Sequence, residues 1–172
     1  MHSSSMANDE RAGDDDGARD FDFLHGRWHV RNRRLRQPLA GSAEWYEFDA
    51  TSEVRPLWNG RGNVEEWIGE MPEGQLCGMS LHLYDPAARQ WRLHWATDRD
   101  GRLGAPTAGQ FRNGRGEFFD HEDYHGRAIL LRLRWEDHGP REARWEQAFS
   151  TDGGASWETN WTMQFTRVTE AS

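Results

Sequence analysis

Residues 127–167 read RAILLRLRWEDHGPREARWEQAFSTDGGASWETNWTMQFTR. Three runs of alternating apolar and polar residues are separated by two turns that contain glycine, at Gly139 and at Gly153-Gly154. Alternation with a period of two predicts strands, and tight glycine turns between them predict antiparallel hairpins. The stretch is therefore predicted to form three consecutive strands of a β-meander.

One face of these three strands is predicted to point into the core, and the other toward water. The inward face carries Ile129, Leu131, Leu133, Trp135, Trp145, Gln147, Phe149, Trp157, Thr159, Trp161, Met163 and Phe165. The outward face carries Arg132, Arg134, Arg144, Glu146, Glu158, Asn160 and Gln164. Gln147 is the one strongly polar residue on the inward face, so it is singled out below.

The same alternation extends back through most of the chain. Further strands are predicted at 28–35, 44–54, 63–69, 76–85, 90–98, 107–111 and 117–120, and a short helix at Asp22–Leu24. Asn113-Gly114 is the strongest short hairpin signal. About ten antiparallel strands in a single meander favour an all-β fold, a closed up-and-down barrel. A barrel of more than about eight strands leaves interior room for a ligand.

Composition limits the classes of function. The chain has 172 residues, which fits one domain, and residues 1–19 are polar enough to predict a disordered acidic tail before a domain at 20–170. The formal net charge of −8 argues against a nucleic-acid partner or an anionic membrane surface. No membrane-spanning run or signal peptide is visible, so we expect a soluble cytoplasmic protein, with a homodimer left open.

The residue inventory excludes several chemistries. Every basic residue is Arg and the chain has no Lys, which excludes a Schiff base. The single Cys77 excludes an internal disulfide and a cysteine-based zinc cluster. We expect no metal and no cofactor. The 10 Trp indicate instead that aromatic surface dominates the core.

Two motifs carry a resemblance to a known group of proteins. The chain opens with Asp20-Phe21-Asp22-Phe23-x-x-Gly26-x-Trp28, and it closes with Arg144-Trp145-Glu146-Gln147, Asp152-Gly153-Gly154, Trp157-Glu158 and Asn160-Trp161. Over about residues 20–168 this resembles the calycin superfamily (lipocalins, fatty-acid-binding proteins, nitrobindins), and more closely a bacterial family of uncharacterised calycin-like proteins. The resemblance implies the barrel fold, and no established reaction comes with that family.

Haem binding of the nitrobindin kind is not expected. That resemblance implies a second glycine soon after Gly-x-Trp and an axial histidine in the closing strands. Here the chain continues His29-Val30-Arg31-Asn32, and residues 144–167 contain no His.

Matching apolar faces predicts the register of the hairpins. Leu83 opposite Leu93 and Leu81 opposite Trp95 would place His82 beside His94 on the polar outer face. Such a pair could hold a metal or move protons, but two solvent-exposed histidines are the interpretation that we favour.

In the closing strands, Trp135 is predicted opposite Trp145, and Trp145 opposite Trp161. Gln147 then lies inward, opposite Leu133 and Thr159. A buried amide needs partners. We leave open whether Gln147 is satisfied by Thr159 or a water, or anchors a polar atom of a ligand.

Residues 63–68 (NVEEWI) place one glutamate inward whichever face is buried: Glu65 with Asn63 and Trp67, or Glu66 with Val64 and Ile68. A carboxylate in an apolar cavity has its charged form disfavoured and could act as an acid or a base. The favoured interpretation is an ion pair with Arg34, on the face of Trp28.

Two other motifs are interpreted as turns. Ser150-x-Asp152-x-Gly154-x-x-Trp157 matches an Asp-box but occurs once, and Asp152 is expected to cap a hairpin. Residues 121–125 (HEDYH) lack a metal-ligand spacing and are expected in a solvated loop at Gly126.

The leading hypothesis is a barrel that binds a small apolar or aromatic molecule. The predicted ligand-binding residues are Gln147, Trp145, Trp161, Trp135, Trp95, Thr159, Asn63, Trp67 and Arg34. The alternative is a lyase, isomerase or cyclase that uses Glu65 or Glu66 for acid–base catalysis. An interaction module with a core filled by Trp side chains is a further alternative.

Overall fold

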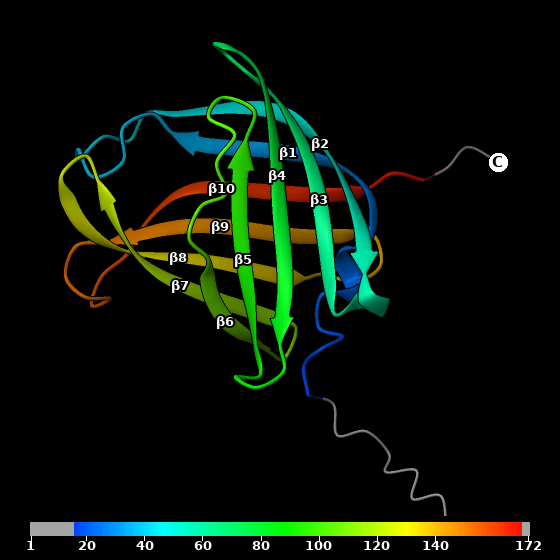
Figure 1. The fold of residues 1–172 in the computed structure, drawn as a ribbon. Helices are drawn as coiled ribbons and strands as arrows, with labels where there is room; N and C mark the ends of the chain where they lie inside the picture. The colour runs from blue at the N-terminus through cyan, green and yellow to red at the C-terminus, as the bar shows by residue number, and fades with distance from the viewer. Residues whose placement is uncertain (1–15, 170–172) are drawn as a thin grey trace, which may run out of the picture.

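In the computed structural model, which describes residues 16–169, ten strands form one closed antiparallel barrel (Figure 1). The strands are β1 (Gly26–Leu35), β2 (Trp45–Leu57), β3 (Gly62–Met71), β4 (Gly74–Asp85), β5 (Gln90–Thr97), β6 (Thr107–Arg112), β7 (Arg115–Tyr124), β8 (Arg127–Asp137), β9 (Glu142–Ser150) and β10 (Glu158–Arg167). The predicted all-β closed barrel is confirmed. A 3-10 turn, η1 (Asp22–Leu24), lies where a short helix was predicted, and a second, η2 (Trp58–Gly60), follows β2.

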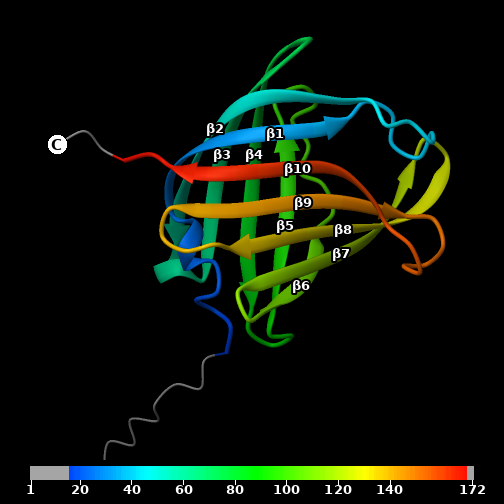
Figure 2. The same cartoon turned by 180° about the vertical axis from the view of Figure 1, so that it is seen from behind.

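Each strand pairs with its neighbours in sequence, and β1 pairs with β10 to close the barrel. Closure removes the unpaired edges that an open sheet would expose. In both views of the ribbon, β8, β9, β10 and β1 run across β3, β4 and β5 at a steep angle (Figures 1 and 2). The described residues contain no helix long and apolar enough to cross a membrane.

One end of the barrel is closed by the segment that leads into β1. Phe21 is fully buried and its ring stacks on His82 with centroids 4.6 Å apart, while it forms edge-to-face pairs with Trp91 and Phe111. Leu24 is also fully buried, and its carbonyl oxygen accepts a hydrogen bond of 2.8 Å from Trp28 Nε1. The aromatic residues of the opening motif therefore form a plug.

The plug extends further toward the N-terminus than the sequence indicated. Residues 16–19 were assigned to the tail, yet Ala18 belongs to the buried core and the Gly17 carbonyl accepts a hydrogen bond of 2.9 Å from Trp91 Nε1. The rest of the predicted tail, residues 1–15, lies outside the described residues. The polar composition of this segment did not predict these contacts, because backbone carbonyl oxygens make several of them.

Arg167 fastens the plug to the last strand. Its guanidinium donates hydrogen bonds to the carbonyl oxygens of Phe23 (2.8 Å), His25 and Pro140 (2.7 Å), and it lies 4.1 Å above the Trp28 ring. Hydrogen bonds from a charged donor are worth about 1.5–3 kcal/mol each in net stability.

We therefore expect Arg167→Ala to lower the free energy of unfolding by about 2–4 kcal/mol. Urea denaturation checks this value, with Arg112→Ala at an exposed strand end as the matched control. A loss no larger than that of the control would show that the plug is held without Arg167.

The register of the β8–β9 hairpin and the positions of two turns follow the prediction. Trp135 pairs with Trp145, Leu133 with Gln147 and Leu131 with Phe149 between β8 and β9. Asn113 and Gly114 both have positive φ in the turn between β6 and β7, as a two-residue hairpin requires. Asp152 caps the turn before β10 through hydrogen bonds from Ser150 and Ser156, so the Asp-box is a turn.

The predicted register of β4 and β5 is wrong by one residue. His82 pairs with Leu93, and Leu81 pairs with His94. His82 is therefore 2% exposed inside the barrel, and no His82–His94 pair lies on the outer face. The prediction failed because it assumed that Leu81 and Leu83 point inward, whereas Ser80 and His82 take the inward positions in this part of β4 and the two leucines lie half-buried outside.

The predicted register of β9 and β10 is also wrong. Trp161 pairs with Gln147 and Met163 with Trp145, after a β-bulge between Thr159 and Trp161. A bulge inserts one residue and so changes which side chains point inward. Asn160, predicted to face water, is 1% exposed as a result.

Candidate functional site: a tryptophan-lined cavity

The barrel encloses a cavity of about 300 Å³ that is lined by aromatic and aliphatic side chains. Its apolar lining includes Trp67, Trp95, Trp135, Trp145, Trp161, Leu93, Leu131, Leu133, Phe149, Met163 and Phe165. Its polar lining includes Glu65, Ser80, His82, His94, Thr107, Glu122 and Gln147. Such a volume with a few convergent polar groups is typical of a small-molecule site.

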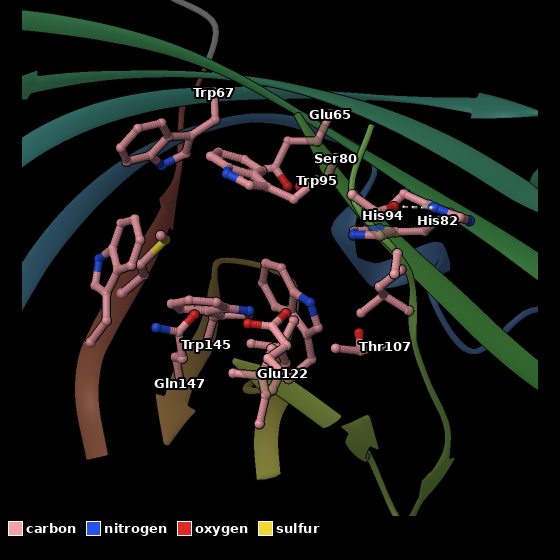
Figure 3. A pocket seen from close by; sticks show the side chains of 18 of the residues that line it. Glu65, Trp67, Ser80, His82, His94, Trp95, Thr107, Glu122, Trp145 and Gln147 are labelled. Atoms are coloured by element: carbon pink, nitrogen blue, oxygen red, sulfur yellow. Dashed lines mark hydrogen bonds between the residues drawn. The ribbon is translucent and has the colours of Figure 1, made fainter. Parts of the chain in front are cut away.

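Two walls face each other across this cavity (Figure 3). Glu65, Ser80 and Trp95 come from β3, β4 and β5 on one side. Trp145, Gln147 and Glu122 come from β9 and β7 on the other. The floor is His82 and Trp135, both of which contact the ring of Phe21 in the plug.

Two glycines make room for the tryptophans of the first wall. A Cβ at Gly69 would collide with the Trp67 ring, and a Cβ at Gly78 would collide with the Trp95 ring. The rings thus lie flat over glycine backbone, and they meet edge to face with centroids 5.9 Å apart. Only glycine at these two positions lets both rings line the cavity without narrowing it.

Glu65 is the inward glutamate, and Glu66 is not. Glu65 is 3% exposed and its carboxylate accepts a hydrogen bond of 2.9 Å from the Ser52 hydroxyl. Glu66 lies outside, 3.6 Å from the guanidinium of Arg55. The expected ion pair with Arg34 is not formed, because Arg34 packs 4.3 Å above the Trp161 ring.

Burial raises the pKa of Glu65 to about 7, since the charged carboxylate loses water. Hydrogen bonds from Ser52 and Ser80 oppose this shift without cancelling it. Glu65 therefore exchanges a proton near neutral pH, which neither a fully exposed nor an ion-paired carboxylate would do.

Three buried polar atoms of the lining residues have no hydrogen-bond partner among the described residues: Trp67 Nε1, His82 Nδ1 and Thr107 Oγ1. Burial lowers the pKa of His82 to about 3, so its ring is neutral. Leaving a buried donor or acceptor unsatisfied costs about 1–3 kcal/mol. A polar partner supplied by water or by a ligand would remove this cost.

Gln147 has a partner that the sequence did not reveal. Its Nε2 donates a hydrogen bond of 2.9 Å to Oδ1 of Asn160, the residue that the β-bulge turns inward. Neither Thr159 nor a ligand is needed to satisfy that donor. Gln147 lines the cavity but is also part of a structural pair.

We accordingly expect Gln147→Leu to lower the free energy of unfolding by about 1–3 kcal/mol, because Asn160 Oδ1 would lose its partner. Thermal or urea denaturation checks this value, with Gln164→Leu on the outer face of β10 as the control. A variant as stable as the control would show that the Gln147–Asn160 bond contributes nothing.

The cavity opens where the pairing of β5 with β6 stops. These strands pair only from Trp91–Gly109 to Leu93–Thr107, and residues 98–106 then pass beside the last part of β5. Gly104 N donates to the Trp95 carbonyl at 2.9 Å, and the Gly104 carbonyl lies 3.1 Å from His94 Nδ1. Trp95 is 37% exposed, so it stands at the mouth.

Glu122 lines the mouth of the cavity from strand β7. Residues 121–125 were expected to form a solvated loop, but β7 extends to Tyr124. Burial and the neighbouring Asp120 raise the pKa of Glu122 above the ordinary value for glutamate. Its carboxylate faces the same space as that of Glu65 (Figure 3). The cavity thus carries one carboxylate in its interior and one at its entrance.

Of the residues predicted from sequence, seven line this one cavity: Glu65, Trp67, Trp95, Trp135, Trp145, Gln147 and Trp161. Four do not: Asn63, Thr159, Arg34 and Glu66. Asn63 is fully buried opposite His82, with both amide atoms unpartnered among the described residues, and Thr159 pairs with Ala148 beside the bulge.

Of the polar lining residues, sequence reasoning missed Ser80, His82, His94, Thr107 and Glu122. The alternation Ser80-x-His82-x-Tyr84 could have indicated two of them, since it places polar side chains on one face of β4. In the barrel, this face pairs with the face of β5 that carries Trp91 and Trp95. Within residues 16–169, no group of three or more His, Cys, Asp or Glu side chains is placed to hold a metal ion.

No protein-family model and no curated protein matches the sequence. Among solved structures, the chain is similar to the S-type phycobiliprotein lyase CPES from Guillardia theta. The two share 14% sequence identity at a TM-score of 0.58, over 88% of this chain and 92% of that chain. At that identity the similarity concerns the fold alone, and it fits a calycin-like barrel.

Proposed function

We propose that the protein binds a small, largely apolar or aromatic molecule inside the barrel, and that the tryptophan-lined cavity is the binding site. The motif at residues 20–28 and the calycin-like barrel support the same assignment, since such barrels enclose ligand cavities. The five cavity tryptophans supply flat apolar surface on several sides of the space.

One observation carries this proposal. The lining combines an apolar cavity of about 300 Å³ with three buried polar atoms, on Trp67, His82 and Thr107, that have no hydrogen-bond partner within residues 16–169. A core built only for packing would fill the space and pair these atoms, because each unpaired one reduces stability. A ligand with an apolar body and two or three hydrogen-bonding atoms would satisfy both features.

Native mass spectrometry of the full chain purified from its own cells tests the proposal. We expect a one-to-one complex with a small molecule that dissociates on denaturation. A Trp67→Ala variant should lose the complex, and Trp58→Ala, at an exposed position outside the cavity, should keep it. A complex that survives Trp67→Ala would place the ligand elsewhere.

A second function is supported by Glu65. A carboxyl group with a pKa of about 7 inside an apolar cavity can both donate and accept a proton near neutral pH. We propose as the alternative a lyase, isomerase or cyclase reaction in which Glu65 is the catalytic acid–base. The structural neighbour is named a lyase, which is compatible with this alternative.

Turnover separates the two functions. The molecule found by mass spectrometry is incubated with the wild type and with Glu65→Gln, and its products are measured by chromatography. Conversion by the wild type that falls at least about a hundredfold in Glu65→Gln supports the enzyme. Tight binding without conversion in either protein supports the binding protein.

A further inference from the structure

We propose that the cavity selects an organic cation, an amine or quaternary ammonium joined to an apolar or aromatic body. This rests on the proposed binding function and names the chemical class of its ligand. The charged groups of the lining are all acidic or histidine side chains. The two carboxylates of Glu65 and Glu122 face the cavity, and among the described residues no arginine lines it.

The tryptophan rings supply the second half of a cation site. Trp67, Trp95 and Trp161 form a connected edge-to-face group with centroid separations of 5.9 and 6.0 Å, and Trp145 joins it 5.4 Å from Trp161. The face of a tryptophan ring attracts a cation, and aromatic cages use this attraction to recognise quaternary ammonium groups.

Only one of these four tryptophan rings has an arginine of residues 16–169 stacked on it. Arg34 packs over Trp161 at 4.3 Å but does not line the cavity. The other three rings have no guanidinium stacked on them among the described residues. A ligand cation would therefore be placed between Trp67, Trp95 and Trp145, within the space that Glu65 and Glu122 flank.

Hydrogen bonds within the wall favour a cation over an anion. The Ser52 hydroxyl donates to Glu65, and Ser80 also contributes a hydrogen bond that favours its charged form. The charged form of Glu65 therefore already has hydrogen-bond donors, and a ligand cation would supply the opposite charge. An anionic ligand would meet the carboxyl groups of Glu65 and Glu122, and no arginine of residues 16–169 lines the cavity to pair with it, which is unfavourable in a buried site.

The charge of the whole chain acts in the same direction. The formal net charge is −8, and the carboxyl group of Glu122 stands at the mouth. A negative potential around a concave site raises the local concentration of cations and their rate of association. The entrance and the interior thus favour the same class of ligand.

Three probes that share one aromatic body test the inference: phenethylamine, phenethyl alcohol and phenylacetate, which are cationic, neutral and anionic near neutral pH. Their binding to the full chain is measured by isothermal titration calorimetry. We expect phenethylamine to bind at least about tenfold more tightly than the alcohol, and phenylacetate most weakly.

Matched variants assign the preference to Glu65. Glu65→Gln should bring phenethylamine and the alcohol to within about threefold of each other, while Glu66→Gln on the outer face of the same strand should keep the wild-type ratio. Binding of phenethylamine should also strengthen from about pH 5 to about pH 8 as Glu65 loses its proton. The other titratable groups facing this space are His82, held neutral by its low pKa, His94 and Glu122.

Each remaining outcome overturns the inference. Equal affinity for amine and alcohol, or tightest binding of phenylacetate, would leave the binding function standing but assign the ligand to another class. An unchanged ratio in Glu65→Gln would move the cation away from Glu65. Failure of all three probes to bind would count against the binding function as well.

Discussion

A Glu65→Gln variant is expected to be more stable than the wild type by about 3 kcal/mol at about pH 8, and equally stable at about pH 4. The pKa of Glu65 rises from 4.5 in the unfolded chain to about 7 in the folded one. Between these values the folded state holds a proton that the unfolded state has released. Stability from this group is therefore full below about pH 4.5 and is lost as the pH rises through about 7.

Glutamine keeps the shape of the protonated carboxyl and never becomes charged, so it removes that loss. Urea denaturation across this pH range measures the difference between the two proteins. Glu66→Gln is the matched control, since Glu66 lies next in sequence but outside the barrel. If the two glutamine variants follow the same pH dependence, Glu65 is not a buried acid with a raised pKa.

Trp67→Ala is expected to lower the free energy of unfolding by about 3–5 kcal/mol, because the ring is 1% exposed and its removal leaves a void between Phe48, Trp95 and Trp161. The same change should weaken the binding of phenethylamine at least about tenfold. Denaturation and calorimetry measure the two effects.

Trp58→Ala is the control for this prediction, since Trp58 is 67% exposed on η2 and does not line the cavity. Trp67→Phe keeps an aromatic ring and removes the indole N–H, so it separates packing from hydrogen bonding if the alanine variant fails to fold. A stable Trp67→Ala protein with unchanged affinity would contradict the assignment of Trp67 to the site.

The fold was predictable from sequence because each strand carries its own alternation and the turns carry their own glycines. The pairing of Trp135 with Trp145 follows from two apolar runs that flank one short turn. The next hairpin was not predictable in register. The bulge between Thr159 and Trp161 leaves no distinct sequence pattern, yet it turns Asn160 inward to bond Gln147.

The site was predictable in part for a related reason. Five of the predicted tryptophans (Trp67, Trp95, Trp135, Trp145 and Trp161) line the cavity, whereas Trp157, also predicted to point inward, precedes β10 and packs under the guanidinium of Arg132. On β4, Ser80, His82 and Tyr84 point inward, and Leu81 and Leu83 are half-buried outside. Predicting register by pairing apolar residues assumes that every inward side chain is apolar. A barrel with polar groups facing an interior cavity violates that assumption at the positions where function is expected.

Binding inside the cavity can be followed through the indole N–H signals of the 10 Trp by nuclear magnetic resonance. On titration with phenethylamine and with phenethyl alcohol, we expect the signals of Trp67, Trp95, Trp135, Trp145 and Trp161 to shift. Those of Trp45 and Trp58, which do not line the cavity, should stay in place. Shifts confined to tryptophans outside the cavity, or no shift at saturating concentrations of either probe, would show that the interior cavity is not the binding site.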